Sequence, residues 1–526
     1  MSTRMNGGQA LVAALEAHGI RVVFGIPGTH NLPIYGALAG SQITHVLTRH
    51  EQGAGYAADG YARATGQPGV AVTTSGPAIL NAAAAAAQAY SDSIPVLLIS
   101  PGLPLRHPGH GNGILHEIKD QIGALDSIVG HSQRVTSVEE IPLAVAQCFA
   151  AMTSGRPRPA FLEIPLDLLD EAADVRILGP VTLAPVAAAE GDLVRARTLL
   201  VAADAPLIIA GGGSSTAATE LRELAELLGA PVITTTNGKG VLPESHPLGL
   251  GAGVHLPSVA DLVNESDVVL AVGTELAPSD FWNGPLDADG KLIRVDIDPT
   301  SLYTNAIPSV ALVGDASLTV RALMEGLDRS PAEERAEGWR TRLRVDSRSE
   351  GKNYLGIVEA LAKALDEDAI LAGDSTMACY YGAMANLPLH RPRSFLYPTG
   401  VGTLGYGLPA AIGAKVAVGE RQVVAMLGDG GIMFTVAELA AASELRVPLP
   451  IIVVDNGGYG EIRDEMVGRA DPVHAVGLAP IDFPALARSM GCLGVGLDSA
   501  EQLTDALTKA FAADRPTVIH IREERT

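Results

Sequence analysis

Short runs of apolar, β-branched residues alternate with longer amphipathic stretches rich in alanine and leucine along the whole chain. This alternation is typical of parallel sheets, because their strands are covered by helices on both faces and therefore read as continuous apolar runs. We predict an α/β fold made of doubly wound parallel-sheet domains.

Two segments interrupt this pattern and divide the apolar runs into three groups. Residues 178–189 are rich in proline and alanine, and residues 330–352 are charged. Since one domain takes ~150 residues, a chain of 526 residues is too long for a single core. We predict three domains, over residues 1–180, 190–345 and 352–526. The expected strands are 22–26, 45–48, 69–74, 95–100 and 159–164, then 206–210, 231–236, 267–272 and 291–297, then 369–372, 422–427, 450–454 and 516–521, with a helix over 81–90.

The composition is that of a folded chain without membrane segments. Hydrophobic residues make up 47% and charged residues 18%, the reverse of a disordered chain. No apolar run reaches the roughly 18 residues of a membrane span, and the longest, residues 81–89, gives way to Asp92. The polar N-terminal residues do not resemble a secretion signal, so we expect a cytoplasmic protein without a membrane partner.

Charge and cysteine content exclude further classes. The 37 Lys and Arg against 59 Asp and Glu give a formal net charge of −22, which disfavours nucleic acid as a partner. Cys148, Cys379 and Cys492 lie far apart without a CxxC pair. We therefore expect them to be small buried residues, with neither a disulfide framework nor a zinc site.

The segment over residues 422–463 reads as one βαβ unit. Its two apolar runs end in Gly428-Asp429 and in Asn456-Gly457-Gly458, with a helical pattern over 435–445 between them. The two strands of such a unit are parallel, so both turns emerge at the same carboxyl edge of the sheet, where open α/β folds bind ligands.

The residue types at these turns suit a hard cation that holds a phosphorylated ligand. Asp429 offers a carboxylate, Asn456 an amide oxygen and Gly458 a backbone carbonyl, a partial shell for Mg²⁺ that phosphate oxygens and water would complete. Gly430 and Gly431 let the backbone approach the phosphates and offer N–H donors. Either turn alone would be an ordinary tight turn, but their pairing in one unit favours the cation site.

The two turns together resemble the cofactor motif of thiamine-diphosphate-dependent enzymes. The likeness extends over residues 22–35, 48–66, 73–82 and 402–414, which look like the 2-oxo acid decarboxylase and acetolactate synthase group. The resemblance implies thiamine diphosphate and Mg²⁺ as cofactors. It also implies the domain order pyrimidine-binding, central and diphosphate-binding.

The resemblance assigns roles to individual residues. Glu51 falls on the carboxylate that protonates the cofactor's ring nitrogen N1′, so that the 4′-imino group can take the C2 proton; outside this motif, such a glutamate would be an ordinary capping residue. The Gly402 carbonyl would bind the 4′-amino group, and Leu404 would either bend the cofactor or be plain core. The other residues implied to contact the cofactor or its metal are Ser375, Thr376, Gly428, Asp429, Gly430, Gly431, Asn456, Gly458 and Tyr459.

The family also places Glu51 of one chain beside Asp429 of another. The smallest catalytic unit would then be a homodimer, and we expect a homotetramer built from dimers. A large interface between subunits would bury part of the apolar excess.

The resemblance further implies addition of the cofactor to a 2-oxo acid, decarboxylation and an enamine intermediate, which a proton, a second carbonyl compound or an oxidant then captures. Acetolactate synthases carry a GMHG-like turn and an Arg-rich segment at the positions where this chain has residues 251–255 and 274–280. Because this chain lacks both, the case for carboligation and for flavin binding is weaker. The Gly-rich turn over 211–215 lacks a third spaced glycine and reads as an ordinary connection. Benzoylformate decarboxylases have histidine at the position of Thr74, so this chain is a poor match to those enzymes.

Six polar residues are candidates for the substrate end of the site. Residues 111–121 and 456–466 most resemble a subgroup that decarboxylates 5-guanidino-2-oxopentanoate, and a carboxylate such as Glu461 suits a guanidinium tail. Alternatively, Glu461 pairs with Arg463 or Lys119 on a solvated face. His116 is the candidate proton donor, although a lone histidine is more often structural. The six candidates are Thr29, His30, Thr74, His116, Asp280 and Glu461.

The leading hypothesis is a thiamine-diphosphate- and Mg²⁺-dependent lyase that decarboxylates a small 2-oxo acid without an oxidant. The second enzymatic hypothesis is carboligation of the acetolactate synthase type. A third, from another class, is a nucleotide-binding or regulatory protein with a vestigial cofactor site. The presence of Glu51, Asp429 and Asn456 argues against this third hypothesis.

Overall fold

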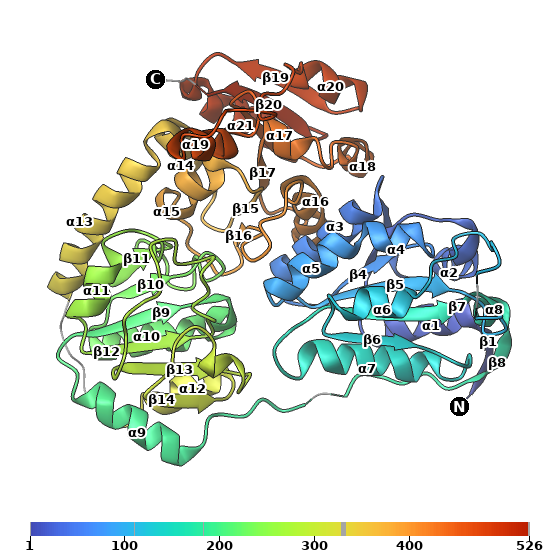
Figure 1. The fold of residues 1–526 in the computed structure, drawn as a ribbon, viewed down its shortest axis with the longest axis horizontal. Coiled ribbons are helices and arrows are strands. Elements are labelled where there is room, and N and C mark those ends of the chain that lie inside the picture. The colour runs from blue at the N-terminus through green and yellow to red at the C-terminus, as the bar shows by residue number, and fades with distance from the viewer. Residues whose placement is uncertain (1, 110, 182, 328–332, 524–526) are drawn as a thin grey trace.

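Three six-stranded sheets form the framework of the protein. The computed structural model describes residues 2–109, 111–181, 183–327 and 333–523. Neighbouring strands within each of these sheets are parallel, and the sheets lie in three separate bodies around a common junction (Figure 1). The predicted α/β class with three doubly wound parallel-sheet domains is confirmed.

The N-terminal sheet has the strand order β3-β2-β4-β5-β7-β6. Successive residues of its strands enter different cores, because side chains alternate between the two faces of a sheet. Val70 packs with α1 and α7, whereas Ala71 packs with α3 and α5. The elements are β2 (Val22–Gly25), β3 (Thr44–Leu47), β4 (Gly69–Val72), β5 (Val96–Gly102), β6 (His131–Arg134), β7 (Ala160–Pro165), α1 (Gly7–Ala17), α2 (Leu32–Leu38), α3 (Glu51–Thr65), α4 (Pro77–Asn81), α5 (Ala83–Ser91), α6 (Gln121–Asp126), α7 (Ile141–Thr153), α8 (Leu166–Asp170) and the antiparallel pair β1 (Thr3–Asn6) and β8 (Ala172–Val175).

The central sheet has the order β11-β10-β9-β12-β13-β14. The prolines and alanines over 178–189 form no helix or strand among the described residues, as expected of a linker. The elements are β9 (Pro206–Ala210), β10 (Val232–Thr234), β11 (Gly249–Gly251), β12 (Val268–Val272), β13 (Leu292–Asp296), β14 (Val310–Val313), α9 (Glu190–Val201), α10 (Ala218–Leu228), α11 (Val259–Glu265) and α12 (Ala316–Leu323).

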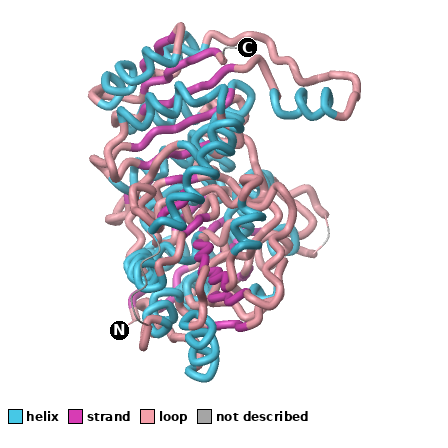
Figure 2. Tube along the Cα trace, turned by 90° about the vertical axis from the view of Figure 1, so that its left-hand side faces the viewer, coloured by secondary structure: helices cyan, strands magenta, loops and turns pink. Residues whose placement is uncertain are grey.

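The C-terminal sheet has the order β16-β15-β17-β18-β20-β19. Its strands lie in a stack with helices on either side (Figure 2). The elements are β15 (Ile370–Gly373), β16 (Phe395–Leu396), β17 (Val423–Gly428), β18 (Pro450–Asp455), β19 (Leu493–Leu497), β20 (Thr517–Arg522), α14 (Leu355–Ala364), α15 (Met384–Asn386), α16 (Gly407–Val418), α17 (Asp429–Ile432), α18 (Glu438–Leu445), α19 (Gly460–Gly468), α20 (Phe483–Ser489) and α21 (Leu503–Phe511).

Each predicted strand overlaps an observed one, but the sequence missed the edge strands β6, β11, β14, β16 and β19. Of these, β6, β11, β16 and β19 are short, polar or partly exposed and lack the apolar run that marks a buried strand. Strand β14 was missed although its four residues are apolar. The helix expected over 81–90 corresponds to α5, and Asn81 is the last residue of the preceding helix α4. Part of the charged segment over 330–352 forms α13 (Glu333–Glu350), and its residues 330–332 lie outside the described chain.

The N-terminal and C-terminal domains meet where α3 crosses α16. A Cβ atom on Gly60 would lie 2.2 Å from the Ala410 oxygen, and one on Gly413 would lie 1.9 Å from the Ala57 oxygen. Only glycine therefore permits this close approach of two helices. The alanine and glycine that raise the apolar fraction of the chain partly serve this contact.

Two further expectations concern membranes and cysteines. None of the helices in the described part of the chain is long and apolar enough to cross a membrane. The three cysteines are free and buried, as predicted.

Candidate active site

The two turns that the sequence pairs lie side by side in the structure. Strands β17 and β18 are parallel neighbours with Gly428 opposite Val454, so Asp429 and Asn456 leave the sheet at the same edge. The backbone N–H of Asn456 donates a hydrogen bond to the Asp429 carboxylate. The βαβ arrangement therefore brings both candidate metal ligands together.

The ionised form of the Asp429 carboxylate is electrostatically unfavourable in this structure. Burial, and after it the charge of Asp455, raises the pKa of Asp429 to about 6. Asp455 itself is held by His520 at 2.9 Å and by the backbone N–H of Gly457 at 2.9 Å. A divalent cation at Asp429 would offset this repulsion.

The donor set at this edge fits Mg²⁺ shared with a diphosphate. Among the described residues, no group of three or more His, Cys, Asp and Glu side chains could hold a metal ion. One carboxylate from Asp429, an amide oxygen from Asn456 and a carbonyl from Gly458 leave several positions for phosphate oxygens and water, as Mg²⁺ prefers.

Close packing around the glycines forms a cradle at the same edge. A Cβ atom on Gly428 would lie 2.9 Å from Oγ1 of Thr376, and one on Gly430 would lie 2.9 Å from the ring of Tyr459. The structure thus brings Thr376 and Tyr459 to the turn that holds Asp429. Gly431 lies in the same short helix, α17, which starts at Asp429.

Asp374 organises this region, although the sequence did not single it out. Its fully buried carboxylate accepts hydrogen bonds from the backbone N–H groups of Ser375 (2.8 Å), Gly405 (3.1 Å) and Gly407 (3.2 Å). Burial raises its pKa to about 6. Asp374 therefore ties the loop over residues 402–407 to the end of β15; an aspartate directly after a predicted strand was the available signal.

Gly402 and Leu404 lie on that loop. Gly402 has φ of +66°, a conformation that favours glycine, and open space where a side chain would stand. Leu404 is half-buried and is not part of any hydrophobic core cluster of the described chain. This placement disfavours the alternative that Leu404 is plain core.

Glu51 is the first residue of α3, in the N-terminal domain. Its carboxylate accepts a hydrogen bond of 3.0 Å from Nδ2 of Asn81, a partner that the sequence did not indicate.

A second carboxylate, Glu438, reaches the same helix end from the C-terminal domain. It is fully buried and accepts hydrogen bonds of 2.9 Å from the backbone N–H groups of Arg49 and His50. Burial, together with the nearby charge of Glu51, raises the pKa of Glu438 to about 7. The sequence missed Glu438 because it lies almost four hundred positions from the residues it binds.

We expect the burial of Glu438 to make stability depend on pH. Its pKa rises from 4.5 in the unfolded chain to about 7 in the folded protein, so the folded state binds the extra proton between these values. The free energy of unfolding should therefore fall by about 3 kcal/mol as pH rises from 4.5 to 7, and this slope should be lost in Glu438→Gln. Denaturant unfolding at fixed protein concentration over pH 4.5–8 measures it.

The matched control is Glu444→Gln, since Glu444 lies on the same helix but is exposed beside Arg49. This variant should keep the slope of the unmodified protein. An unchanged slope in Glu438→Gln would contradict the assignment.

Three polar side chains of the N-terminal domain form a chain of contacts. Nδ1 of His30 lies 2.6 Å from Oγ of Ser75, which lies 3.4 Å from Nδ1 of His116. Burial and the neighbouring His116 lower the pKa of His30. His116 itself has φ of +65°, an unusual conformation outside glycine that is often found at functional sites. Sequence reasoning found both histidines but not Ser75.

The remaining substrate candidates lie apart from these contacts. Thr29 is exposed beside His30, and Thr74 packs its side chain against Gly28. Asp280 lines a cavity between the three domains, and the residues that line this cavity include none over 428–461. Burial raises the pKa of Asp280 to about 7.

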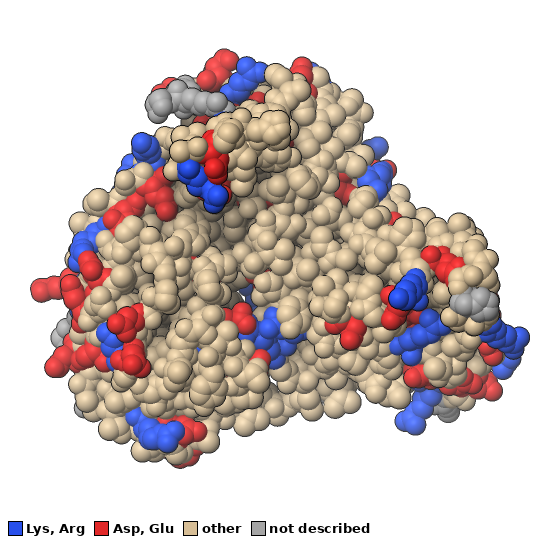
Figure 3. All heavy atoms as spheres, viewed as in Figure 1, with Lys and Arg blue, Asp and Glu red and all other residues tan. Residues whose placement is uncertain are grey.

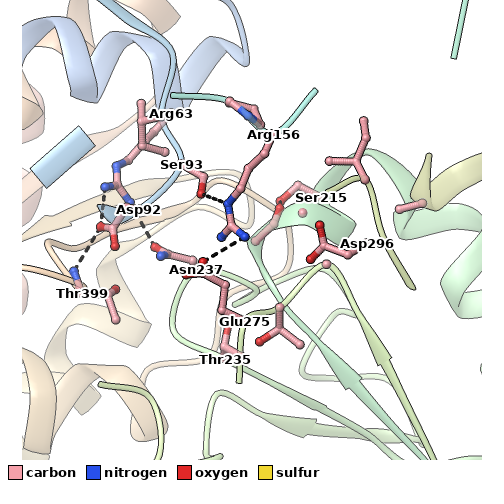
Figure 4. A pocket seen from close by; sticks show the side chains of 18 of the residues that line it. Arg63, Asp92, Ser93, Arg156, Ser215, Thr235, Asn237, Glu275, Asp296 and Thr399 are labelled. Carbon is pink, nitrogen blue, oxygen red and sulfur yellow. Dashed lines mark hydrogen bonds and ion pairs between the residues drawn. The ribbon is translucent and has the colours of Figure 1, made fainter. Parts of the chain in front are cut away.

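The cavity has a volume of about 400 Å³ and is crossed by polar contacts. Arg156, from the N-terminal domain, lies 2.9 Å from Oγ of Ser93 and 2.9 Å from the carboxylate of Glu275 in the central domain (Figure 4). Arg63 bonds Asp92, which in turn accepts from the backbone of Thr399 (Figure 4). A hollow with charged side chains near it is visible where the domains meet (Figure 3).

Glu461 lies in the first turn of α19, which begins at Gly460 shortly after the Asn456 turn. Its two oxygens accept hydrogen bonds from the hydroxyls of Tyr380 (3.1 Å) and Tyr381 (2.9 Å). Arg463 pairs with Asp464 instead, and within the described chain Glu461 forms no ion pair with a Lys, Arg or His side chain. The alternative that Glu461 pairs with Arg463 or Lys119 is therefore not what the structure shows.

A single chain does not join all candidates into one site. As far as the chain is described, no hydrogen bond or ion pair connects Glu51 or His116 to Asp429 or Glu461. The candidates of the N-terminal domain and those of the C-terminal domain therefore form two separate groups.

Comparison with known proteins was consistent along the chain. Residues 5–124 match the thiamine pyrophosphate enzyme N-terminal TPP binding domain, residues 193–323 match the central domain of these enzymes, and residues 376–521 match their C-terminal TPP binding domain.

Curated relatives align over almost the full length. The chain is 42% identical to the probable 2-ketoarginine decarboxylase AruI of Pseudomonas aeruginosa, over 98% of this chain and 94% of that protein. It is 34% identical to the probable acetolactate synthase large subunit of Methanocaldococcus jannaschii, over 98% and 92%. It is 33% identical to the large subunit of acetolactate synthase isozyme 1 of Escherichia coli, over 99% and 94%.

Proposed function

Because this chain belongs to the thiamine pyrophosphate enzyme family, we propose that it is a Mg²⁺-dependent carboxy-lyase that decarboxylates a 2-oxo acid without an oxidant. The proposed substrate is 5-guanidino-2-oxopentanoate, the 2-keto acid of arginine. The relative named as a probable 2-ketoarginine decarboxylase supports this choice. The observation that carries it is the Glu461 carboxylate, which is held by two tyrosines and has no cationic partner within the described chain.

The diphosphate-side residues would hold the cofactor and its metal. Asp429, Asn456 and the Gly458 carbonyl are the proposed Mg²⁺ ligands. Ser375, Thr376, Tyr459 and the backbone over residues 428–431 are proposed to contact the diphosphate. When bound, thiamine diphosphate supplies a nucleophilic carbon and a sink for the electron pair released with CO₂.

The pyrimidine-side residues would control protons. Glu51 is proposed to keep a proton on ring nitrogen N1′ of the cofactor, since its charge stabilises the protonated ring. The Gly402 carbonyl is proposed to accept a hydrogen bond from the 4′-amino group, with Leu404 against the cofactor.

His116 is the proposed donor of the proton that replaces CO₂ on the product carbon. Its imidazole carries a ring nitrogen that can donate a proton, and the contact of Nδ1 with Ser75 orients the ring. Burial and the neighbouring His116 lower the pKa of His30, which contacts His116 through Ser75.

A second copy of the chain is proposed to complete each site, in a homotetramer built from dimers. Large apolar side chains are exposed beside both halves of the site: Leu80 precedes Asn81, the partner of Glu51, while Met433 and Phe434 follow α17. Burial of these side chains by the facing subunit would bring Glu51 of one chain to Asp429 of the other.

The test is a measurement of CO₂ release by the purified protein with thiamine diphosphate and Mg²⁺ on a panel of 2-oxo acids. We expect 5-guanidino-2-oxopentanoate to give CO₂ and 4-guanidinobutanal. Absence of CO₂ from every member would reject the proposal. Formation of acetolactate rather than acetaldehyde from pyruvate would favour carboligation, the activity named for the two acetolactate synthase relatives.

A further inference from the structure

Three aromatic rings from two domains form a group around the two tyrosines that bind Glu461. The rings of Tyr380 and Tyr381 lie 4.6 Å apart, and the ring of Trp282, from the central domain, stands edge-on to them at 6.3 and 6.0 Å. We refer to Trp282, Tyr380, Tyr381 and Glu461 as the aromatic–carboxylate cluster. It joins the central domain to the domain that carries the proposed metal site.

The backbone is shaped to direct both tyrosines at one carboxylate. Consecutive residues of an α-helix point about 100° apart. Tyr380 and Tyr381 lie instead in a π-helical turn, Ala378–Ala383, a rare conformation that is frequent at functional sites. Both hydroxyls reach Glu461, which fixes the position of its two oxygens and leaves further lone pairs on each.

The electrostatic environment of the cluster is negative. Burial raises the pKa of Tyr381, and the charges of Glu461, Glu350 and Asp464 raise it further. Arg463, on the same helix as Glu461, pairs with Asp464, and His255, on which Trp282 packs, lies 3.1 Å from Glu350. A positively charged ligand would therefore be attracted to Glu461.

Trp282 is fixed but still presents part of its ring to solvent. Its Nε1 donates to the carbonyl of Ser279 at 3.0 Å, and its ring packs on the buried His255 at 4.3 Å. The residue nevertheless remains 42% exposed. A fixed, partly exposed indole that stands edge-on to the two tyrosines holding Glu461 is suited to contact a flat cation.

The cluster lies close to the proposed metal turn. Gly460, directly before Glu461, approaches Asn456 so closely that a Cβ atom would lie 2.4 Å from Nδ2 of Asn456. Met377, three positions before Tyr380, has its sulfur 3.7 Å from the same nitrogen. A substrate that reacts beside the metal could therefore extend its tail to Glu461.

We propose that the aromatic–carboxylate cluster binds the guanidinium group of the substrate and sets the preference for a cationic 2-oxo acid. This inference rests on the proposed function and adds Trp282, Tyr380 and Tyr381 to it. The planar guanidinium would donate two hydrogen bonds to Glu461 and pack against the indole. Tyr380 and Tyr381 act as positioning residues, because they hold the carboxylate.

A pair of isosteric substrates tests the proposal in the holoenzyme with thiamine diphosphate and Mg²⁺. 5-Ureido-2-oxopentanoate has the shape of 5-guanidino-2-oxopentanoate without its charge. We expect Glu461→Gln to lower kcat/KM for the guanidino acid by about 100-fold, mainly through KM, and to change that for the ureido acid by less than about threefold. Tyr380→Phe and Tyr381→Phe should give smaller losses with the same selectivity.

The matched control is Glu465→Gln, which removes an exposed charge four positions along the same helix. It should leave the ratio of the two substrates nearly unchanged. An equal loss on both substrates in Glu461→Gln, or an equal change of the ratio in Glu465→Gln, would overturn the proposal.

A binding measurement separates this proposal from the catalytic one. 5-Guanidinopentanoate lacks the 2-oxo group and cannot be decarboxylated. The chain has two tryptophans, so Trp339→Phe leaves Trp282 as the reporter. We expect saturable fluorescence quenching that Glu461→Gln abolishes; binding that is unaltered in Glu461→Gln would reject the cluster whatever the activity. If Trp339→Phe does not fold, calorimetry on the holoenzyme makes the same comparison. Absence of CO₂ from both substrates together with Glu461-dependent binding would reject the proposed function alone.

Discussion

Glu51→Gln is expected to lower kcat for decarboxylation by about 10²–10⁴-fold, the range that one general acid–base group contributes. Glutamine has nearly the same size, and its amide oxygen can still accept the hydrogen bond from Asn81. It carries no charge, so it cannot stabilise a proton on the cofactor ring. The structure of the site should be retained while its proton chemistry is lost.

The measurement is steady-state CO₂ release, with thiamine diphosphate binding followed by calorimetry. Cofactor affinity should change by less than about tenfold, because the residues proposed to contact the metal and the diphosphate lie in another domain. Glu139→Gln, on an exposed turn, is the control and should retain full activity. If Glu51→Gln keeps more than about a tenth of kcat, the assigned role is wrong.

Asp429→Asn is expected to abolish activity through loss of the metal. Asp429 is the one carboxylate among the three proposed ligands, so its replacement leaves only neutral oxygens for Mg²⁺. The fall in affinity should exceed the 10–100-fold that follows loss of an outer-sphere partner. Calorimetric titration of Mg²⁺ in the presence of thiamine diphosphate measures it.

The pKa of Asp429 adds a pH signature to this experiment. A ligand carboxylate must be deprotonated to bind the metal, and the pKa of Asp429 is raised to about 6. In the unmodified protein, the dissociation constant for Mg²⁺ should therefore rise about tenfold per pH unit as pH falls below about 6. Asp471→Asn, an exposed carboxylate beside Arg469, should leave both affinity and pH dependence unchanged. Mg²⁺ binding by Asp429→Asn with unaltered affinity would exclude Asp429 as a ligand.

The pattern of apolar residues along the chain was sufficient to predict the strands that are buried in the middle of a sheet. Strands β17 and β18 were predicted because each is a run of apolar residues, and the order of a βαβ unit then placed Asp429 and Asn456 at one edge. Edge strands such as β6 and β19 escaped prediction, since a strand covered on one side needs no continuous apolar run.

The residues of the candidate site likewise fall into those that the sequence predicted and those that it missed. Asp429 and Asn456 lie in two paired turns, so their residue types and spacing were enough to single them out, whereas Glu51 was singled out by the resemblance of its motif to the family. Asp374, Glu438 and the two tyrosines around Glu461 were not predicted. Their chemistry depends on contacts between segments that are distant in sequence, such as Glu438 with the N-terminus of α3.

The sequence by itself determined the three parallel-sheet domains and the motif-borne candidates for metal and cofactor binding, because periodicity and turn chemistry act over a few residues. Only the tertiary structure decided the environment of each group. It placed Asp280 at the cavity between domains and Glu461 among aromatic rings rather than against Arg463. Burial and the nearest charged neighbours set the behaviour of a carboxylate, and both are properties of the folded chain.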